Sequence, residues 1–123
     1  MNGIEMLVDT NVLINLVEGK VNLIDKLKGN RLFVSVITEM ELLGWYKITD
    51  GQKKLFSSLL RECRVVDFSS EIKSIAIAIK QNQKVKLPDA IIAATSVYLG
   101  IPLMTFDADF QKIKGLNLLL LEE

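Results

Sequence analysis

The sequence predicts an α/β fold in which a parallel sheet is covered by helices on both faces. Short apolar segments of strand length alternate along the chain with longer segments whose apolar residues recur at helical spacing. Such alternation is typical of βαβ units, whose connecting helices cover both faces of a parallel sheet. With 123 residues, half of them hydrophobic, the chain can bury one core but not two. Residues 1–123 are therefore expected to form a single domain.

Five apolar segments are expected to form the strands of this sheet. The first ends directly before Asp9, and the fourth ends two residues before Asp107. Short apolar runs bounded by polar residues are typical of strands buried on both faces. The expected strands cover residues 4–8, 32–34, 65–66, 102–105 and 118–121.

Helices are expected between these strands. Ser35 is a favoured N-cap residue, and a helical pattern follows it to about Lys47. Pro88 and Gly100 stand where a helix prefers its first residue and its stop. Residues 90–99 between them are apolar nearly all round, so this helix should be buried. The other helical patterns lie around residues 13–19, 23–27, 56–63 and 72–79, with a short one after residue 107.

The composition restricts the chemistry available to the chain. It contains no histidine, which excludes histidine acid–base catalysis, Ser-His triads and His-ligated zinc. The lone Cys63 excludes an intramolecular disulfide, and no glycine-rich phosphate-binding motif is present. The net charge of zero lacks the basic excess typical of nucleic-acid-binding modules. Any catalysis must use carboxylates, hydroxyls, lysine, arginine or a bound ion.

The pattern of apolar residues also bears on localisation. No apolar run approaches the roughly 18 residues that span a bilayer. The N-terminal residues carry an acid and lack the basic region of a secretory signal. A cytoplasmic protein that does not enter a membrane is therefore expected.

Four acidic residues from distant segments are expected to meet at one edge of the sheet. Ligands of an open parallel sheet bind beyond the carboxyl ends of its strands. Asp9 and Asp107 follow the first and fourth expected strands, so both lie at this edge. Helices that lead into the next strand begin at the same edge. They add Asp89 in a first turn and Glu41, which comes six residues after Ser35.

Each of these acids also has a purely structural interpretation. Asp9 could cap the helix that follows it, and Asp89 could complement a helix macrodipole. Thr38 and Glu41 have the spacing of a capping box, and Asp107 could be a turn residue. Taken singly, each structural interpretation is the stronger one, whereas chance placement of all four at one edge is improbable.

Two further acids compete with members of this set. Glu39 and Glu41 are two residues apart in one expected helix and point to nearly opposite sides, so only one can face the site. Asp109 competes in the same way with Asp107. Topology alone leaves both choices open.

Electrostatics favours a metal ion among these acids. Two carboxylates about 4 Å apart repel each other by roughly 4 kcal/mol at an effective dielectric constant near 20. A group of them would take up protons or recruit a divalent cation. Oxygen ligands without histidine or cysteine select hard metals, so Mg²⁺ or Mn²⁺ is expected. This combination suits phosphodiester hydrolysis.

Four segments resemble the successive motifs of PIN-domain ribonucleases, in the order and spacing of that family. They are residues 7–11 (LVDTN), 34–44 (VSVITEMELLG), 87–95 (LPDAIIAAT) and 104–110 (MTFDADF). The resemblance implies a Rossmann-like three-layer domain that cleaves single-stranded RNA with Mg²⁺ or Mn²⁺ and leaves a 5′-phosphate. Members of this size are most often VapC-type toxins, which form homodimers and are inhibited by a cognate antitoxin protein.

The resemblance also assigns the site residues. It implies Glu41 rather than Glu39, because the family's acid is followed by Leu, and it favours Asp107 as the fourth acid. The principal metal ligands are then Asp9 and Asp89. The pocket is completed by Glu41 and Asp107, which bind the metal directly or through water. The supporting residues expected around them are Asn11, Thr105 and Asp109.

Other classes of function remain as alternatives. A PIN fold kept as an RNA- or protein-binding scaffold would have lost at least one acid, whereas all four are present. A phosphoryl-accepting signalling domain would need paired acids after the first strand, where the chain offers Asp9 alone. A dehalogenase-type phosphatase would need Asp-x-Asp there, and position 11 is Asn.

Two pairs of residues near the motifs are ambiguous. Lys84 and Lys86 could contact RNA phosphates, but a solvated loop is the stronger interpretation. Trp45 and Tyr46 are expected to make core or dimer contacts rather than to stack on bases.

Overall fold

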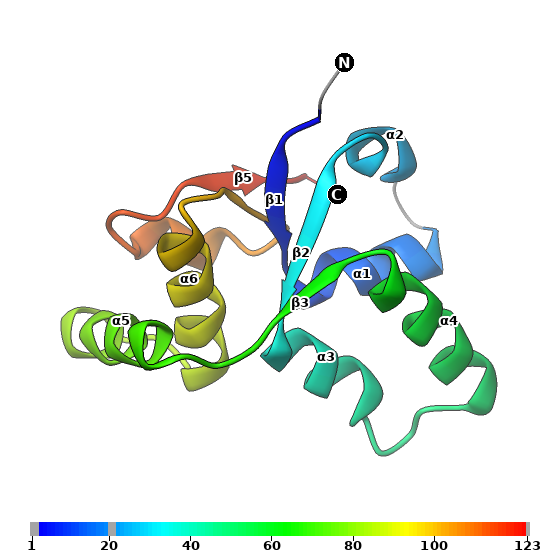
Figure 1. Cartoon of the computed structure of the whole chain (residues 1–123), viewed down its shortest axis with the longest axis horizontal. Helices are drawn as coiled ribbons and strands as arrows, with labels where there is room; N and C mark the ends of the chain where they lie inside the picture. The colour runs from blue at the N-terminus through cyan, green and yellow to red at the C-terminus, as the bar shows by residue number, and fades with distance from the viewer. Residues whose placement is uncertain (1–2, 20–21, 123) are drawn as a thin grey trace.

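The computed structural model describes residues 3–19 and 22–122 and contains a five-stranded, wholly parallel sheet (Figure 1). The strands are β1 (Glu5–Val8), β2 (Arg31–Ser35), β3 (Arg64–Val66), β4 (Leu103–Thr105) and β5 (Leu118–Leu120). They lie in the order β3-β2-β1-β4-β5. The chain first steps outward from β1 to β3 and then returns to place β4 on the other side of β1. At such a reversal an open α/β sheet forms a crevice beyond its strand ends.

Helices cover both faces of the sheet. They are α1 (Thr10–Glu18), α2 (Ile24–Leu27), α3 (Val36–Leu43), α4 (Asp50–Arg61), α5 (Ser70–Asn82), α6 (Leu87–Leu99) and the 3₁₀ helix η1 (Ala108–Lys112). Figure 1 shows α5 and α6 on one side of the sheet and α1, α2 and α4 on the other. The three-layer α/β/α fold that the sequence predicts is thus confirmed. Within residues 3–19 and 22–122, no helix combines the length and the apolar character needed to cross a membrane.

The side chains of β1 alternate between two cores, one on each face. Leu7 packs in the core that includes Ile92 of α6, whereas Met6 and Val8 pack in the core that includes Leu13 of α1. All of these side chains are buried. Full burial of each contributes roughly 1.5–3 kcal/mol. This two-sided burial explains why the strand reads as a continuous apolar run rather than as an alternating one.

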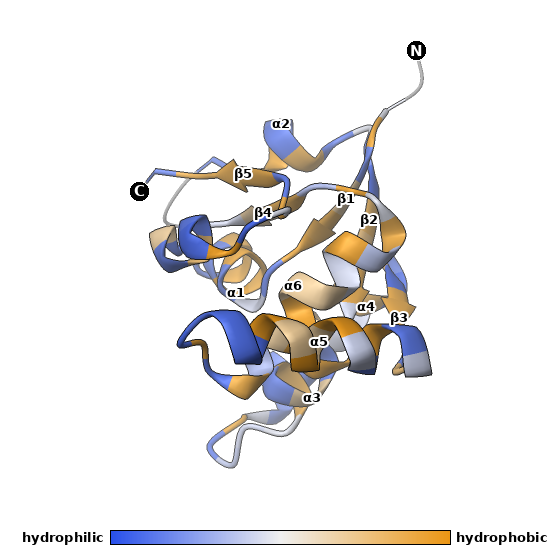
Figure 2. Cartoon of the chain, turned by 90° about the vertical axis from the view of Figure 1, so that its left-hand side faces the viewer, coloured by the Kyte–Doolittle hydropathy of each residue, from blue (hydrophilic) through white to orange (hydrophobic). Residues whose placement is uncertain are grey.

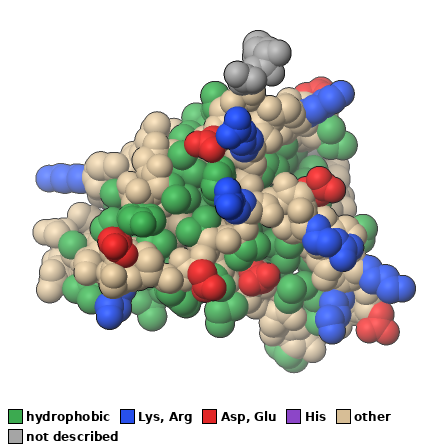
Figure 3. All heavy atoms as spheres, viewed as in Figure 1, with side chains coloured by type: hydrophobic (Ala, Val, Ile, Leu, Met, Phe, Trp, Pro, Cys, Tyr) green, Lys and Arg blue, Asp and Glu red, His purple; other side chains and the backbone are tan. Residues whose placement is uncertain are grey.

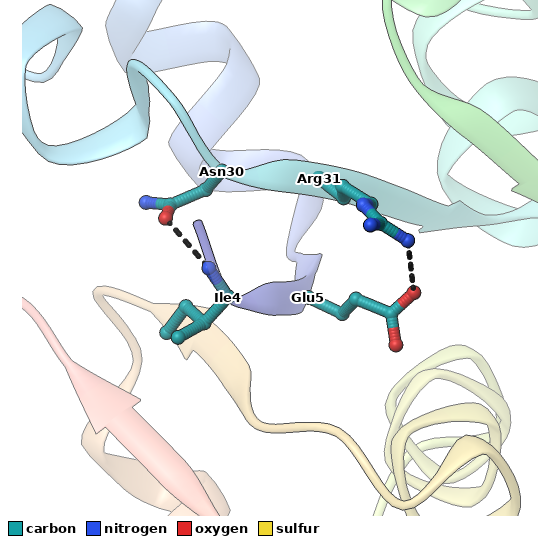
Figure 4. Close-up of polar contacts among 4 residues, drawn as sticks. All are labelled: Ile4, Glu5, Asn30 and Arg31. Carbon is teal, nitrogen blue, oxygen red and sulfur yellow. Dashed lines mark hydrogen bonds and ion pairs between the residues drawn. The ribbon is translucent and has the colours of Figure 1, made fainter. Parts of the chain in front are cut away.

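The beginnings of β1 and β2 are joined by polar contacts (Figure 4). The backbone N–H of Ile4 donates to Oδ1 of Asn30 at 3.1 Å, and Arg31 forms an exposed ion pair with Glu5 at 3.5 Å. Gly3 lies directly against the backbone carbonyl of Gly29, so no side chain fits there. These contacts hold Glu5 opposite Arg31, which sets the register of the two strands.

Most helix ends match the sequence signals, but one expected helix is too long. Ser35 caps α3 as predicted, because its hydroxyl accepts from the N–H of Ile37 at 3.1 Å. The prediction that this helix continues to about Lys47 is wrong, since α3 ends at Leu43. A true capping box, formed by Thr49 and Gln52, starts α4 soon afterwards, so the intervening residues must form the turn.

Two further structural interpretations are also wrong, the second of them in part. The N-cap of α3 is Ser35, so Thr38 and Glu41 do not form a capping box, and Thr38 is buried inside the helix. Trp45 and Tyr46 lie in the turn after α3 with 46% and 85% of their surface exposed. Neither residue is part of the core, whereas the dimer contacts expected as the other possibility stay a prediction.

Candidate active site

The reversal of strand order brings two acid-bearing segments side by side. β1 and β4 are neighbouring strands, and the N–H of Asp9 donates to the carbonyl of Met104 at 2.9 Å just past their paired residues. Asp9 is the N-cap of α1, and Asp107 is the N-cap of η1. Asp9 therefore has the capping role considered above, Asp107 caps a helix rather than only forming a turn, and both also lie at the carboxyl edge of the sheet.

Two further acids reach the same place from helices. Asp89 lies in the first turn of α6, which begins at this edge, and Glu41 lies in the second half of α3. A cavity of about 570 Å³ is lined by Asp9, Glu41, Asp89 and Asp107 together. The structure therefore brings together the four acids that the sequence analysis selected. Glu39 does not line this cavity, so the geometry separates it from Glu41.

A hydrogen-bond network centred on Thr105 holds the Asp9 carboxylate. The hydroxyl of Thr105 donates to Oδ2 of Asp9 at 2.6 Å, and the backbone N–H of Thr10 donates to Oδ1 at 2.8 Å. The Thr105 hydroxyl in turn accepts from Nδ2 of Asn11 at 3.4 Å and from the N–H of Asp107 at 3.0 Å. Asn11 and Thr105 thus lie where a carboxylate-orienting pair should lie.

Thr10 is a residue of this site that the sequence analysis did not select. Its hydroxyl donates to Oε1 of Glu41 at 2.7 Å, and it lies 3.0 Å from the hydroxyl of buried Thr38. Thr10 therefore fixes the end of the Glu41 side chain, while its N–H binds Asp9. The available signal was its place inside the LVDTN motif, directly after the first acid.

Asp109 occupies a different position from the other acids. Its N–H donates to Oδ1 of Asp107 at 2.9 Å, which completes the first turn of η1. Its exposed side chain lines a neighbouring cavity and is absent from the lining of the cavity that the four acids share. Of the two competing acids, Asp107 is thus the one that lines the acidic cavity.

Burial and crowding raise the pKa of two of these carboxyl groups. The pKa of Asp9 is raised to about 6, chiefly by burial, against the hydrogen bonds from Thr105 and Thr10 that lower it and with smaller increases from Asp89 and Glu41. The pKa of Asp89 is also raised, chiefly by burial and then by Asp107 and Glu41, against the opposing effect of Lys86. The negative charge of the carboxylates in this cavity is therefore poorly compensated.

The donor chemistry of the cavity suits a hard divalent cation. All of its acidic ligands offer oxygen, and hard cations such as Mg²⁺ and Mn²⁺ prefer carboxylate oxygen. In residues 3–19 and 22–122, no group of three or more acids is placed to hold one ion with the side chains as they stand. The raised pKa of buried Asp9 nonetheless indicates a carboxylate that lacks a positive partner. In donor type and charge, the residues fit such a cation.

Replacing Thr105 by Val is expected to raise the pKa of Asp9 above about 6 and to destabilise the fold. Val keeps the shape but removes the donor to Oδ2, which leaves a buried carboxylate oxygen unsatisfied at a cost of about 1–3 kcal/mol. An NMR titration of the Asp9 carboxyl and urea unfolding measure the two effects. Thr105→Ser, which keeps the hydroxyl, should stay close to the wild type. An unchanged Asp9 pKa in Thr105→Val would contradict this role.

Comparison with known proteins gives one family and a set of similar structures. The sequence model of the PIN domain family matches residues 6–116. A toxin–antitoxin complex from Klebsiella pneumoniae is 33% identical with a TM-score of 0.75, covering 90% of this chain and 94% of the matched chain. VapBC2 from Rickettsia felis, bound to a DNA fragment from its promoter, is 18% identical with a TM-score of 0.81, covering 96% and 99%. No curated protein sequence matches the chain significantly.

A third similar structure is VapBC-1 from nontypeable Haemophilus influenzae. It is 24% identical with a TM-score of 0.76, and the match covers 95% of this chain and 97% of that one. These matches extend over nearly the whole length of both chains. The sheet, the surrounding helices and the reversal between β1 and β4 thus form one shared architecture.

Proposed function

The chain belongs to the PIN-domain family, and from this premise we propose that it is a Mg²⁺- or Mn²⁺-dependent endoribonuclease that hydrolyses single-stranded RNA. One observation carries the proposal: Asp9, Glu41, Asp89 and Asp107 come from four separate elements and line one cavity at the reversal of the sheet. Four such acids do not stabilise the fold together, because burial and, second to it, their mutual repulsion raise the pKa of two of them. Together they suit a cation that acts on a phosphodiester.

In this proposal Asp9 and Asp89 are the principal metal ligands, and Glu41 and Asp107 complete the site directly or through water. When bound, a divalent cation supplies Lewis acidity that activates water and offsets charge on the phosphoryl group. The chain's own hydrogen bonds do the positioning. Thr105 orients the Asp9 carboxylate, Asn11 braces Thr105, and Thr10 holds the Glu41 carboxylate. The hydrolysis leaves a 5′-phosphate on one product.

We further propose that the protein is the toxin of a toxin–antitoxin pair in the cytoplasm. The similar structure from Klebsiella pneumoniae is a toxin–antitoxin complex, and its identity to this chain is 33%. Exposed apolar side chains, including Ile14 and Trp45, line the same cavity as the acids. A cognate antitoxin bound there would cover the site, and a homodimer of one-domain chains is the expected assembly.

A non-catalytic PIN scaffold that binds RNA or protein is the alternative. It is favoured by one observation, namely that no three acids within residues 3–19 and 22–122 converge on one point as placed. The raised pKa of Asp9 opposes it, because a scaffold has no use for a poorly compensated buried carboxylate. A phosphoryl-accepting domain finds less support, since its paired acids after the first strand are missing.

Purified protein is expected to cut a single-stranded RNA pool in Mn²⁺ or Mg²⁺ and to leave it intact in EDTA. Gel separation of end-labelled RNA detects the cuts, and ligation that requires a 5′-phosphate identifies the product ends. Restoring the metal after chelation should restore cleavage. Folded, antitoxin-free protein that never cuts, or that cuts equally well in EDTA, would contradict the proposal and favour the scaffold.

A further inference from the structure

A second cavity adjoins the acidic one and has a different character. Its volume is about 490 Å³, and its lining includes Asp89 and Asp107, which also line the acidic cavity. The two cavities therefore share a wall and form one continuous surface. Four lysines also line the second cavity, which we call the lysine cavity: Lys80, Lys84, Lys86 and Lys112.

The fold gathers these lysines from two separate segments. Lys80 lies in the last turn of α5, Lys84 and Lys86 lie in the loop that leads into α6, and Lys112 ends η1. Nζ of Lys80 donates to the carbonyl of Val85 at 2.7 Å, which ties the loop to the end of α5. Figure 2 shows the hydrophilic end of α5 on the side of the molecule that carries β4 and β5.

The positive end of α6 lies beside the lysine cavity, whose lining includes Lys86 and Asp89. Lys86 is the N-cap of α6, and no side chain caps this helix. Its contribution is that of the helix macrodipole, because Pro88 has no N–H and the N–H of Ala90 donates to the carbonyl of Lys86 at 2.9 Å. The cavity thus combines several positive side chains with the positive end of a 13-residue helix.

The positive charges in this cavity are not all neutralised by ion pairs within the described part of the chain. In the described part of the chain, none of the four lysines forms a salt bridge with a carboxylate. Lys86 interacts electrostatically with Asp89, whose pKa it lowers. Four lysines thus face three carboxylates, Asp89, Asp107 and Asp109, and any cation bound at the shared wall would make the cavity more positive. On the face shown in Figure 3, basic side chains are scattered with acidic ones among them.

We propose that the lysine cavity binds a backbone phosphate of the RNA strand whose neighbouring phosphodiester is cut in the acidic cavity. This inference rests on the proposed function and adds to it a second contact point on the substrate. An RNA strand with one phosphate at the acids continues along the surface of the protein. The wall of Asp89 and Asp107 that the two cavities share lies between the acids and the lysines. Lysine ammonium groups bind phosphate without reading the base.

The test measures RNA binding apart from cleavage. Fluorescence anisotropy of a labelled single-stranded RNA is titrated with wild type and with Lys84→Gln/Lys112→Gln at several salt concentrations, once in EDTA and once in Ca²⁺. Both lysines are exposed, so the variant should fold normally. The expected result is an affinity loss of about 10-fold and a salt slope smaller by roughly 0.7, the value for one lost phosphate contact on a single strand.

The matched control is Lys26→Gln/Lys28→Gln. These lysines are equally exposed and precede β2, so they lie at the opposite edge of the sheet from the acids. The control should bind RNA as the wild type does. Replacing single phosphates of the RNA by neutral methylphosphonates adds a positional test. A neutral replacement at one linkage beside the cut should weaken binding by the wild type. The same replacement should have little further effect on binding by the lysine variant.

The outcomes separate this inference from the proposed function. Wild-type RNA binding that is unaffected by the lysine substitutions, or affected equally by the control, would overturn the inference even if the protein cuts RNA. No measurable RNA binding by the wild type in EDTA or in Ca²⁺ would also overturn it. Lysine-dependent binding without cleavage in Mn²⁺ would support the lysine cavity and contradict the nuclease.

Discussion

Cleavage of single-stranded RNA is expected to fall by at least about 100-fold when Asp89 is replaced by Asn or Glu41 by Gln. Both side chains line the acidic cavity, and both raise the pKa of a neighbouring acid through their negative charge. Loss of a residue that only supports a metal ligand costs roughly 10- to 100-fold, so loss of a ligand should cost more. Initial rates in saturating Mn²⁺ measure the effect, with circular dichroism to verify the fold.

Glu39→Gln is the matched control for Glu41→Gln. The two residues belong to the same helix, carry the same group and lie two positions apart, but only Glu41 lines the acidic cavity. The control should cut RNA at the wild-type rate. Equal losses in both variants would point to a general effect of charge on RNA binding. Full activity in Asp89→Asn would remove that acid from the site.

The centre of the sheet could be predicted well from the sequence because most of β1 and all of β4 are buried. These strands then read as short apolar runs, and the run at β1 is bounded by Asp9. Helix ends with their own chemical signal were also correct, as at Ser35 and Gly100, where φ is +67°. The predicted end of α3 was wrong because the apolar pattern of the sequence continues past Gly44 into an exposed turn.

The four acids could be selected because topology alone places them at one edge. Position along a strand or helix can be read from the sequence, whereas the direction of a side chain depends on packing. Thr10 was missed for this reason, since its contact with Glu41 joins segments 31 residues apart. Lys84 and Lys86 were considered as phosphate contacts, but the sequence favoured a solvated loop, because Lys112 joins them only when η1 folds against the loop before α6.

The strongest stability effect in the protein should come from Asp9. Burial and its acidic neighbours raise its pKa from 3.8 to about 6, so the folded protein binds this proton more tightly than the unfolded chain does. The stability from this proton is fully present below pH 3.8 and is lost as the pH rises through about 6. At neutral pH the ionised Asp9 therefore costs the fold about 3 kcal/mol, at 1.36 kcal/mol per pKa unit.

Asp9→Asn is thus expected to be more stable than the wild type at pH 7.5 in EDTA, although it should be inactive. Asn carries no charge and can still accept from the N–H of Thr10, but it loses the strong bond from Thr105, at about 1 kcal/mol. The net gain of 1–2 kcal/mol should raise Tm by roughly 5 °C. Calorimetry should show that this advantage vanishes near pH 4, and that Mn²⁺ raises the Tm of the wild type more than that of the variant. A variant that is less stable than the wild type at pH 7.5 would show that Asp9 is held by its hydrogen bonds more strongly than burial disfavours its charge.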